Sequence, residues 1–516
     1  MKLSKSTKTV IIAAGVLLVL GVVLMVLLLT KPAVEEESED SSSVPDTSVT
    51  VTDKEPEDVQ SLTVKNEKGE FTLDRAERVV TSTDEEGNIS SETQVYWTSG
   101  ELLGVAPNDT SIRAFVNNMA GIFSREPVEE NAEDLGKYGL ENPSAQVEVE
   151  FTDGSSASLC FGIQNPAATN FAYFRLADSR DVHQVSYYSV GSAYNDIRDF
   201  ASLTMTEGYS QNDPKELDYL IIERKDFEEP VEIRFMFDVA EAAEDEDAII
   251  TTFNSHRFIS PINTEVDSVK GQTLCYGVYG LSMASCLSLE QTEENMAEAG
   301  LDDPYCKVTF KYGGKRRVLR LGNEIVQVTE SETEGNPALT TVIGYYAMIE
   351  GVEGIYAIDK DSAPWYTFTL DNVMSRRPIS PYIYTVDTLE ITTEQGSYLF
   401  KIEGDADSNT ITCNGEEVKA DGFRKLYQYL ITSIGEELYF EEQSDPFITL
   451  KFTYREGYED TYGTTQDVIE FYRSDDRNSI IAVNGTVLFK VREVYTDRLL
   501  SNLQAVIDGG EVELNF

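Results

Sequence analysis

The stretch YGLENPSAQVEVEFTDGSSASLCFG, residues 138–162, carries the clearest structural pattern in the chain. After a Gly-Leu pair and a proline, Val147, Val149 and Phe151 alternate with polar residues, which is the period of a β-strand with one buried face. Asp153-Gly154 then predicts a tight turn, and a second strand runs on to a closing glycine. The stretch therefore predicts an antiparallel strand pair that follows a Gly-Leu and proline segment.

This pattern recurs twice farther along the chain. Residues 299–322, AGLDDPYCKVTFKYGGKRRVLRLG, repeat the Gly-Leu pair, the proline, the three alternating apolar residues, the turn and the closing glycine. A third copy follows Asp445-Pro446 and keeps the apolar positions Leu450, Phe452 and Tyr454, but lacks the Gly-Leu pair. The internal repeat predicts three related modules.

Each predicted module places a hairpin and a helix before the strand pair. Two alternating apolar runs around a polar turn predict hairpins at residues 61–73, 218–235 and 387–402. Apolar residues at three- and four-residue spacings predict helices capped by Asp109 or Thr110 in the first module, running from about Val269 to Met283 in the second, and including Phe423 to Ile434 in the third.

After the strand pair, every module continues with an aromatic, alternating segment that predicts a closing hairpin and then a short helical patch, such as Asp497 to Leu503. The predicted fold class is α+β, with three related modules that each pack a helix on one face of an antiparallel sheet, after an N-terminal transmembrane helix. These modules cover residues 61–205, 215–385 and 387–516, and the third is divergent.

The N-terminal segment predicts a membrane anchor. Residues Val10 to Leu29 contain no charged residue and match the roughly 20 residues that a helix needs to cross a bilayer. Lysines precede this segment and acidic residues follow it, so the positive-inside rule places residues 1–9 in the cytoplasm and the remainder outside. The run is longer than that of a typical cleaved secretory signal, and the first cysteine, Cys160, lies too far away for a lipoprotein. We expect a single-pass protein of the cell membrane with extracytoplasmic modules.

Composition limits the classes of partner. The chain of 516 residues has 41 basic and 91 acidic residues, a net charge of −50, which argues against nucleic-acid binding because that depends on basic surfaces. Residues 30–60 are rich in serine, proline and acidic residues without apolar periodicity, and they predict an extended stalk. Hydrophobic residues make up 41% of the chain, which is enough for packed cores beyond the stalk.

No set of residues predicts a catalytic site. The two histidines, His183 and His256, fall in different modules, which excludes a three-histidine zinc site and argues against a catalytic triad. We interpret His183 as a partly exposed strand residue. The stretch from Gly280 to Ala284 resembles a hydrolase nucleophile elbow but is one residue short, and we expect its serine, Ser282, to lie in a helix.

Metal sites are not predicted either. Asp405, Asp407, Asn409 and Glu416 copy the spacing of a calcium loop, but Thr410 stands where that loop needs glycine, so we favour a β-turn. The acidic clusters of the chain are interpreted as solvated loops, with divalent-cation binding as the alternative. These clusters are Glu241 to Asp247 and Asp475-Asp476.

The cysteines do not predict a redox centre. Their spacing contains no C-x-x-C pair, which excludes a thioredoxin-type motif, and we expect Cys160 and Cys306 to be buried apolar residues. The five are Cys160, Cys275, Cys286, Cys306 and Cys413. No glycine-rich phosphate loop follows a predicted strand. We therefore predict no catalytic, cofactor-binding or metal-binding residues.

The blocks YGLENPSAQVEVEFTDG and VKNEKGEFTL and the closing Leu-x-Phe-Gly strand resemble the bacterial extracytoplasmic family called domain of unknown function 4340. The resemblance is clear over about residues 60–205, moderate over 215–385 and weak over 387–516. It implies a membrane-anchored protein, often linked to ABC transporters of the gliding-motility type, with an accessory or envelope-assembly role. It carries no catalytic residues over to this chain.

We expect a non-enzymatic binding or assembly protein that presents its modules to an envelope or transporter partner. One alternative is a surface hydrolase that acts on cell-wall glycan or peptide through paired carboxylates, which the many acidic residues allow. Another is a spacer or adhesion protein. The sequence leaves these three open.

Overall fold

A computed structural model of the chain describes residues 49–50, 54–83, 89–124, 127–210, 217–235, 256–262, 264–267, 269–329, 338–378, 381–404, 409–432, 435–457, 465–474 and 476–514. The predicted anchor, most of the predicted stalk and the acidic cluster from Glu241 to Asp247 lie outside these residues. Within the described ranges, no helix combines the length and the apolar character needed to cross a bilayer.

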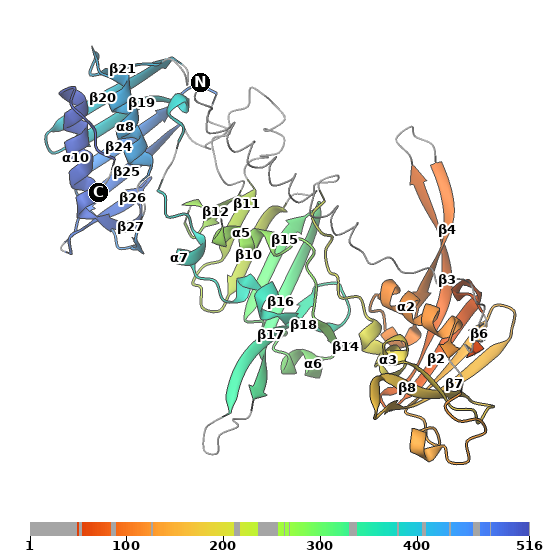
Figure 1. The fold of residues 1–516 in the computed structure, drawn as a ribbon. Coiled ribbons are helices and arrows are strands. Elements are labelled where there is room, and N and C mark those ends of the chain that lie inside the picture. The colour runs from red at the N-terminus through yellow and green to blue at the C-terminus, as the bar shows by residue number, and fades with distance from the viewer. Residues whose placement is uncertain are drawn as a thin grey trace, which may run out of the picture.

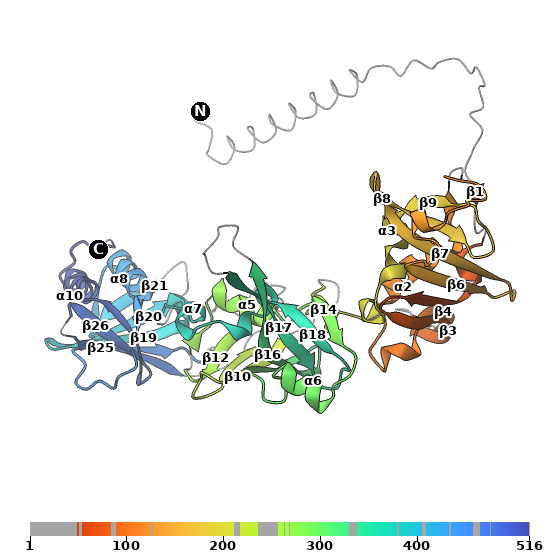
Figure 2. The ribbon, with the colours of Figure 1, turned by 90° about the horizontal axis from the view of Figure 1, so that it is seen from below.

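Three large antiparallel sheets make up most of the described chain and follow one another across the view (Figures 1 and 2). The first has the order β4-β3-β2-β6-β7-β8-β9, with strands Val59–Asn66 (β2), Gly69–Thr83 (β3), Ile89–Thr98 (β4), Ala145–Phe151 (β6), Ser156–Asn165 (β7), Ala168–Leu176 (β8) and His183–Ser186 (β9). A separate two-stranded sheet pairs Val49–Thr50 (β1) with Phe123–Ser124 (β5).

The second and third sheets have nine strands each. The second has the order β13-β12-β11-β10-β15-β16-β17-β18-β14, with strands Leu217–Arg224 (β10), Val231–Phe235 (β11), His256–Ser260 (β12), Thr264–Glu265 (β13), Ser285–Ser288 (β14), Cys306–Tyr312 (β15), Lys315–Thr329 (β16), Leu339–Ile349 (β17) and Ile355–Asp359 (β18). The third has the order β22-β21-β20-β19-β24-β25-β26-β27-β23, with strands Val386–Thr393 (β19), Gly396–Gly404 (β20), Asn409–Cys413 (β21), Glu416–Glu417 (β22), Glu437–Leu438 (β23), Ile448–Tyr454 (β24), Gln466–Arg473 (β25), Asn478–Val483 (β26) and Thr486–Arg492 (β27).

A single connection plan underlies all three sheets. The first three strands form a meander, and the chain then returns from the sheet edge to place its next main strand beside the first one (β6, β15 and β24). The return segment holds the helix: Asp109–Ala120 (α2), Lys270–Tyr276 (α5) with Glu293–Glu298 (α6), or Ala420–Ile431 (α8). The prediction of antiparallel sheets with helices is confirmed. The shared connection plan explains why the same apolar pattern recurs in the sequence.

The strand pair at the centre of the repeat forms as predicted. Along β6, burial alternates strictly, so that Val147, Val149 and Phe151 face the core while the glutamates between them face solvent. Strand β24 of the divergent third copy buries the same alternate positions. The three opening hairpins and the three closing hairpins are also confirmed.

The helix of the first sheet has the predicted apolar face but a different cap. Ile112, Phe115, Val116 and Met119 are all buried against the sheet. The cap is Asn108, whose side-chain oxygen accepts the backbone N–H of Ser111 at 3.1 Å. The prediction of Asp109 or Thr110 as the cap was wrong, because the Asp109 carboxylate instead accepts from the Trp97 backbone and pairs with Arg113.

The predicted middle helix, Val269 to Met283, was wrong in length. Helix α5 ends at Tyr276, and the chain then turns through Gly280, whose φ of +63° lies in the left-handed region that favours glycine. At the end of the third sheet the error is in the opposite direction. Where a short patch from Asp497 to Leu503 is predicted, the structure has the longer helix Glu493–Ile507 (α10), which stacks its Tyr495 on Tyr429 of α8.

Candidate binding site at the end of the first sheet

Asn66 and Arg224 occupy the same place in the first two sheets. Each is the last residue of the first strand of its sheet. Each lies opposite the first residue of the main strand that returns beside it, Ala145 of β6 or Cys306 of β15. Both side chains donate hydrogen bonds to carbonyl groups of the short 3-10 segment that follows the last strand of their sheet, Gly191–Tyr194 (η4) or Pro364–Tyr366 (η7). The position is therefore an anchor that ties the end of the sheet to the chain leaving it.

In the first sheet the anchor is an amide. The side-chain nitrogen of Asn66 donates to the carbonyl oxygens of Ala193 and Asn195, both at 2.9 Å. Its side-chain oxygen accepts the backbone N–H of Lys68 at 2.8 Å. All of these contacts bind backbone groups, so Asn66 fixes the β2–β3 turn against η4.

In the second sheet the anchor is a buried guanidinium. Arg224 is 7% exposed and grips the Asp226 carboxylate with two hydrogen bonds of 2.6 and 3.0 Å, while its remaining nitrogen donates to two carbonyls of η7. The rings of Phe227 and Phe368 lie 4.0 and 4.8 Å from the guanidinium carbon. Hydrogen bonding to Arg224 lowers the pKa of Asp226. This anchor is both charged and enclosed by aromatic rings.

The glycines of the repeated motif form a close backbone contact in both sheets. Gly139 and Gly300 adopt φ values of +69° and +66°, which suit glycine at the end of a helical turn. A Cβ added to Gly162 would lie 2.1 Å from the carbonyl oxygen of Tyr138, and one added to Gly322 would lie 2.0 Å from that of Ala299. No side chain fits at either place, so the motif is required for packing.

A tyrosine completes this contact in each sheet. The hydroxyl of Tyr194 donates to the carbonyl oxygen of Gly162 at 3.0 Å, and that of Tyr366 donates to the carbonyl oxygen of Gly322 at 3.2 Å. Burial raises the pKa of both hydroxyl groups, so they stay protonated donors. We call the close glycine contact together with this tyrosine bond the glycine–tyrosine lock.

The space beside the lock differs between the two sheets. In the second sheet, the rings of Tyr305 and Tyr345 lie 4.5 and 3.7 Å from that of Tyr366 and fill it. The strand register places Ser144 and Ala172 of the first sheet at the equivalent positions. Ser144 lines a pocket of about 450 Å³ next to Tyr194, whereas Ala172 is buried in the core of the first sheet.

Residues from four chain segments line this pocket, which is the candidate site. They are Asn66, Glu67, Lys68, Ser144, Gly162, Ile163, Gln164, Tyr187, Gly191, Tyr194 and Asn195. The rings of Tyr187, in Tyr187–Val190 (α3), and Tyr194 stack with their centroids 5.6 Å apart and form one wall. The polar side chains of Glu67, Lys68 and Gln164 are exposed at the rim.

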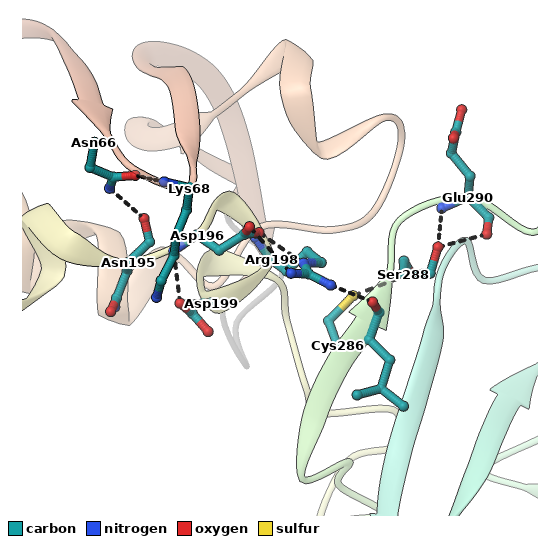
Figure 3. A network of polar contacts seen from close by, with 10 residues as sticks. Asn66, Lys68, Asn195, Asp196, Arg198, Asp199, Cys286, Ser288 and Glu290 are labelled. Carbon is teal, nitrogen blue, oxygen red and sulfur yellow. Dashed lines mark hydrogen bonds and ion pairs between the residues drawn. The ribbon is translucent and has the colours of Figure 1, made fainter. Parts of the chain in front are cut away.

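The site is joined to the second sheet through a short polar chain of contacts (Figure 3). Asp196, beside Asn195, pairs with Arg198 at 2.9 Å. Arg198 in turn donates to the carbonyl oxygen of Leu287 in β14 at 2.6 Å. A bridge between Thr204 and Ser282 adds backbone pairing at the same junction.

A second pocket, of about 420 Å³, lies where the second and third sheets meet. Arg224 and Asp226 form one side, and the backbone of Glu436, which accepts from Arg376 at 2.9 Å, lies on the other. Residues of the third sheet help to line the pocket beside this anchor, whereas the pocket beside the anchor of the first sheet is lined by residues 66–195 alone.

A family model described as "Domain of unknown function (DUF4340)" matches residues 97–229 and 257–442, which is more than half of the chain. The chain belongs to this family. Each matched segment contains one complete glycine–tyrosine lock, Gly162 with Tyr194 or Gly322 with Tyr366. No curated protein matches the chain. The double match supports the internal repeat read from the sequence, and it ends before the main strand pair of the third sheet, where the Gly-Leu pair is missing.

Neither histidine lines the candidate site. His183 is only 9% exposed and packs on Phe174, so its interpretation as a partly exposed residue was wrong. His256 is buried in β12, with its ring nitrogen 3.3 Å from the carbonyl oxygen of Leu217, and burial lowers its pKa. They lie in different sheets, as their sequence positions predict.

Ser282 does not lie in a helix, so that expectation was wrong. It follows the Gly280 turn and bridges to Thr204 as extended backbone, and its hydroxyl donates to the carbonyl oxygen of Leu203 at 3.3 Å. All five cysteines are buried and unbridged, which confirms the expectation for Cys160 and Cys306. Burial raises the pKa of the Cys306 thiol to about 12, which suppresses thiolate chemistry.

The calcium-like spacing falls on the hairpin between β20 and β21. Gly404 pairs with Asn409, and Asp405 and Asp407 lie outside the described residues. Glu416 lies in β22, paired with Cys413. Of the acid cluster Asp475-Asp476, only Asp476 is described, and it pairs with Lys490 at 2.9 Å. Among the described residues, no group of three or more His, Cys, Asp or Glu side chains is arranged to hold a metal ion.

Sequence reasoning missed the pocket residues Asn66, Tyr187 and Tyr194. The signal that could have found them was the repeat itself. Once the copies are aligned on Gly162 and Gly322, a tyrosine follows the closing hairpin in both, Tyr194 or Tyr366, although the intervening segments differ in length. The residue at the end of each first strand, Asn66 or Arg224, then emerges as a polar residue in an otherwise apolar pattern.

Proposed function

We propose that this chain is a membrane-anchored extracytoplasmic protein that binds or assembles protein partners of the cell envelope, such as a transporter complex, and that catalyses no reaction. The N-terminal apolar segment, Val10 to Leu29, and the acidic composition of the remaining chain support the predicted topology. Membership of the family gives the same expectation without fixing a partner.

Two projecting hairpins carry the proposal (Figure 1). Strand β3 pairs with β2 only as far as Asp74, and beyond it the first arm, residues 75–83 and 89–97, is a two-stranded ribbon. Strand β16 pairs with β15 only as far as Leu321, and β17 pairs with β18 only from Gly344 onward, so the second arm is the two-stranded ribbon of residues 326–329 and 339–342. A two-stranded ribbon is marginally stable alone, so a long arm beyond a sheet is readily explained by a binding role.

The second arm exposes valine side chains on one face. Val326 is 46% exposed and Val328 is 60% exposed, and both lie on one face of the ribbon, opposite Val342 and Thr340. Leu339, which is 67% exposed and pairs with Thr329, lies on the other face. A concentration of β-branched side chains on an unpartnered ribbon is typical of a protein contact surface.

Site-specific crosslinking tests this role. A photoreactive residue at Val328 of the full-length protein in native membranes should give a discrete adduct with an envelope or transporter protein. The same residue at Glu417, exposed in β22 at the edge of the third sheet and away from both arms, is the control and should give much less. Absence of an adduct at Val328, or equal adducts at both positions, would contradict the proposal.

The topology can be tested separately because all five native cysteines are buried. Tyr188 is 95% exposed, so Tyr188→Cys introduces one accessible thiol. A membrane-impermeant maleimide should label this variant in intact cells and leave the parent protein unlabelled. Labelling only after membrane disruption would show that the sheets lie on the cytoplasmic side.

A further inference from the structure

We propose that the pocket beside Tyr194 binds one ring of a neutral carbohydrate. This is a second binding activity, and it does not depend on the arms or on their partner. The proposal stands on three features of the pocket: a volume beside the small residue Ser144, a wall of stacked tyrosine rings, and a rim that supplies hydrogen-bond donors and acceptors in balance.

In the second sheet, tyrosine rings pack on Tyr366, the counterpart of Tyr194. There, Tyr345 lies parallel to Tyr366 within 18°, with ring centroids 3.7 Å apart, and Tyr305 contacts the same ring. In the first sheet, Ser144 stands at the Tyr305 position and lines the pocket, while Ala172 stands at the Tyr345 position and is buried in the core. A ligand with a six-membered ring can therefore take the place that the fold gives to the Tyr305 ring in its other copy.

The wall suits the apolar face of a sugar ring. Tyr187 and Tyr194 are stacked with an angle of 29° between their planes, and both line the pocket. Aromatic faces attract the slightly positive hydrogens of C–H groups because the ring carries negative charge on its face. The wall is also held in place, since the Tyr194 hydroxyl is bonded to Gly162 and the Asn66 amide fixes the backbone of η4. Preorganisation of this kind reduces the entropy lost on binding.

The rim selects for hydroxyl groups and against a purely aromatic ligand. Glu67 supplies an acceptor, Lys68 supplies donors, and Gln164 and Ser144 supply both. Sugar hydroxyls donate and accept at once, so they can use this mixture fully. The single acid and single base among the pocket's lining residues leave it locally neutral, which favours an uncharged ligand.

The same lining argues for binding without cleavage. Glycoside hydrolysis by the usual route needs two carboxyl groups on either side of the scissile bond. Glu67 is the one carboxylate among the residues that line the pocket. The volume of about 450 Å³ is within the range of roughly 300–1,000 Å³ usual for small-molecule sites.

The test measures binding of soluble probes to the full-length protein in detergent. Chitotriose and maltotriose are the carbohydrate probes, N-acetyltyrosinamide is the aromatic probe, and trialanine is the peptide probe, each followed by calorimetry and saturation-transfer NMR. We expect saturable binding of at least one sugar. Gln164→Ala should weaken it roughly 3- to 10-fold, as expected for the loss of one or two neutral hydrogen bonds.

Ser144→Tyr is the decisive variant, because it supplies at the first sheet the residue that fills this space in the second. It should abolish sugar binding while leaving the protein folded. Tyr188→Leu, beside the wall but 95% exposed and not part of the pocket lining, is the matched control and should bind as the parent does. The proposal is overturned if neither sugar binds, if a sugar binds equally to Ser144→Tyr, or if only the aromatic or peptide probe binds. None of these outcomes bears on crosslinking of the second arm.

Discussion

The first two sheets share a backbone plan and a lock, yet the surroundings of the lock have diverged. In the second sheet, Arg224 anchors the exit segment and tyrosines fill the space beside Tyr366. In the first, a smaller amide, Asn66, makes the equivalent bonds, and the space beside Tyr194 is open. The comparison teaches that the glycine–tyrosine lock maintains the fold, while the residues around it are free to take on binding.

The two arms also share a backbone plan but differ in their side chains. The first arm extends the second and third strands of its sheet and satisfies its own charges: Arg75 pairs with Glu77 at 2.9 Å, and Arg78 bonds to Gln94. The second arm extends the β16–β17 hairpin and exposes Val326 and Val328 on one face, whereas the exposed valines of the first arm, Val79 and Val80, are adjacent in sequence and face opposite sides. Because a lengthened hairpin leaves the sheet below it intact, different hairpins can be elongated in different copies.

The two tryptophans of the chain allow each sheet to be followed separately. Trp97 is buried in the first sheet and Trp365 in the second, where its indole N–H donates to the carbonyl oxygen of Leu274 at 2.9 Å. Fluorescence during urea unfolding, with one tryptophan replaced by phenylalanine at a time, therefore reports the stability of one sheet.

The largest expected effect comes from breaking the lock. Gly322→Ala forces a methyl group to within 2.0 Å of a backbone carbonyl oxygen that cannot rotate away, and we expect a loss of about 3 kcal/mol or more from the free energy of unfolding. The Trp365 signal should shift strongly and the Trp97 signal little. Gly162→Ala should show the reverse.

Gly100→Ala is the matched control for this pair, since an added Cβ there has no neighbour within 4 Å. It should change the unfolding midpoint of the Trp97 signal by only a small amount. If Gly162→Ala and Gly322→Ala lowered the free energy of unfolding as little as this control, the glycine–tyrosine lock would not stabilise the two sheets.

The second effect separates the two anchors. Arg224→Met removes four hydrogen bonds of a buried charge, and we expect the second sheet to lose about 2–3 kcal/mol. Asn66→Ala removes neutral bonds at a half-buried site, and we expect the first sheet to lose about 1 kcal/mol. Equal losses in the two urea titrations would show that the anchors are equivalent in energy as well as in position.

The third effect concerns the filled space. Tyr305→Ser should open in the second sheet the volume that Ser144 leaves in the first, at a cost of about 1–2 kcal/mol because the tyrosine is only partly buried. The Trp365 signal measures this cost. Tyr382→Ser, a partly buried tyrosine stacked on Tyr384 away from the lock, controls for the loss of a ring. No change for Tyr305→Ser would mean that packing at Tyr366 does not depend on that side chain.

Much of the fold could be predicted because alternation is a local signal. The positions Val147, Val149 and Phe151 specify a strand, its buried face and, through repetition, the central strand pair of each sheet. The arms were missed because strands exposed on both faces carry no apolar alternation. The middle helix was predicted too long because the turn at Gly280 depends on backbone conformation that spacing does not report.

The candidate site could not be predicted because it has no motif of its own. It combines the β2–β3 turn, the end of β7 and the segment after β9, and a small side chain, Ser144, lines it where the second sheet has Tyr305. The small size of Ser144 is informative only beside the copy that has Tyr305. The expected absence of catalytic and metal residues stays a prediction.

The smallest expected effect is a pH dependence confined to the second sheet. Burial lowers the pKa of His256 below its ordinary value of 6.5, so the folded state keeps this ring neutral where the unfolded chain already binds a proton. The unfolded state then holds more protons, and stability falls as the pH drops from 7.5 through 6.5 towards the folded pKa. His256→Gln should remove this part of the pH slope of the Trp365 signal and leave that of the Trp97 signal unchanged. A variant slope identical to that of the parent would show that carboxylates alone account for the pH dependence of the second sheet.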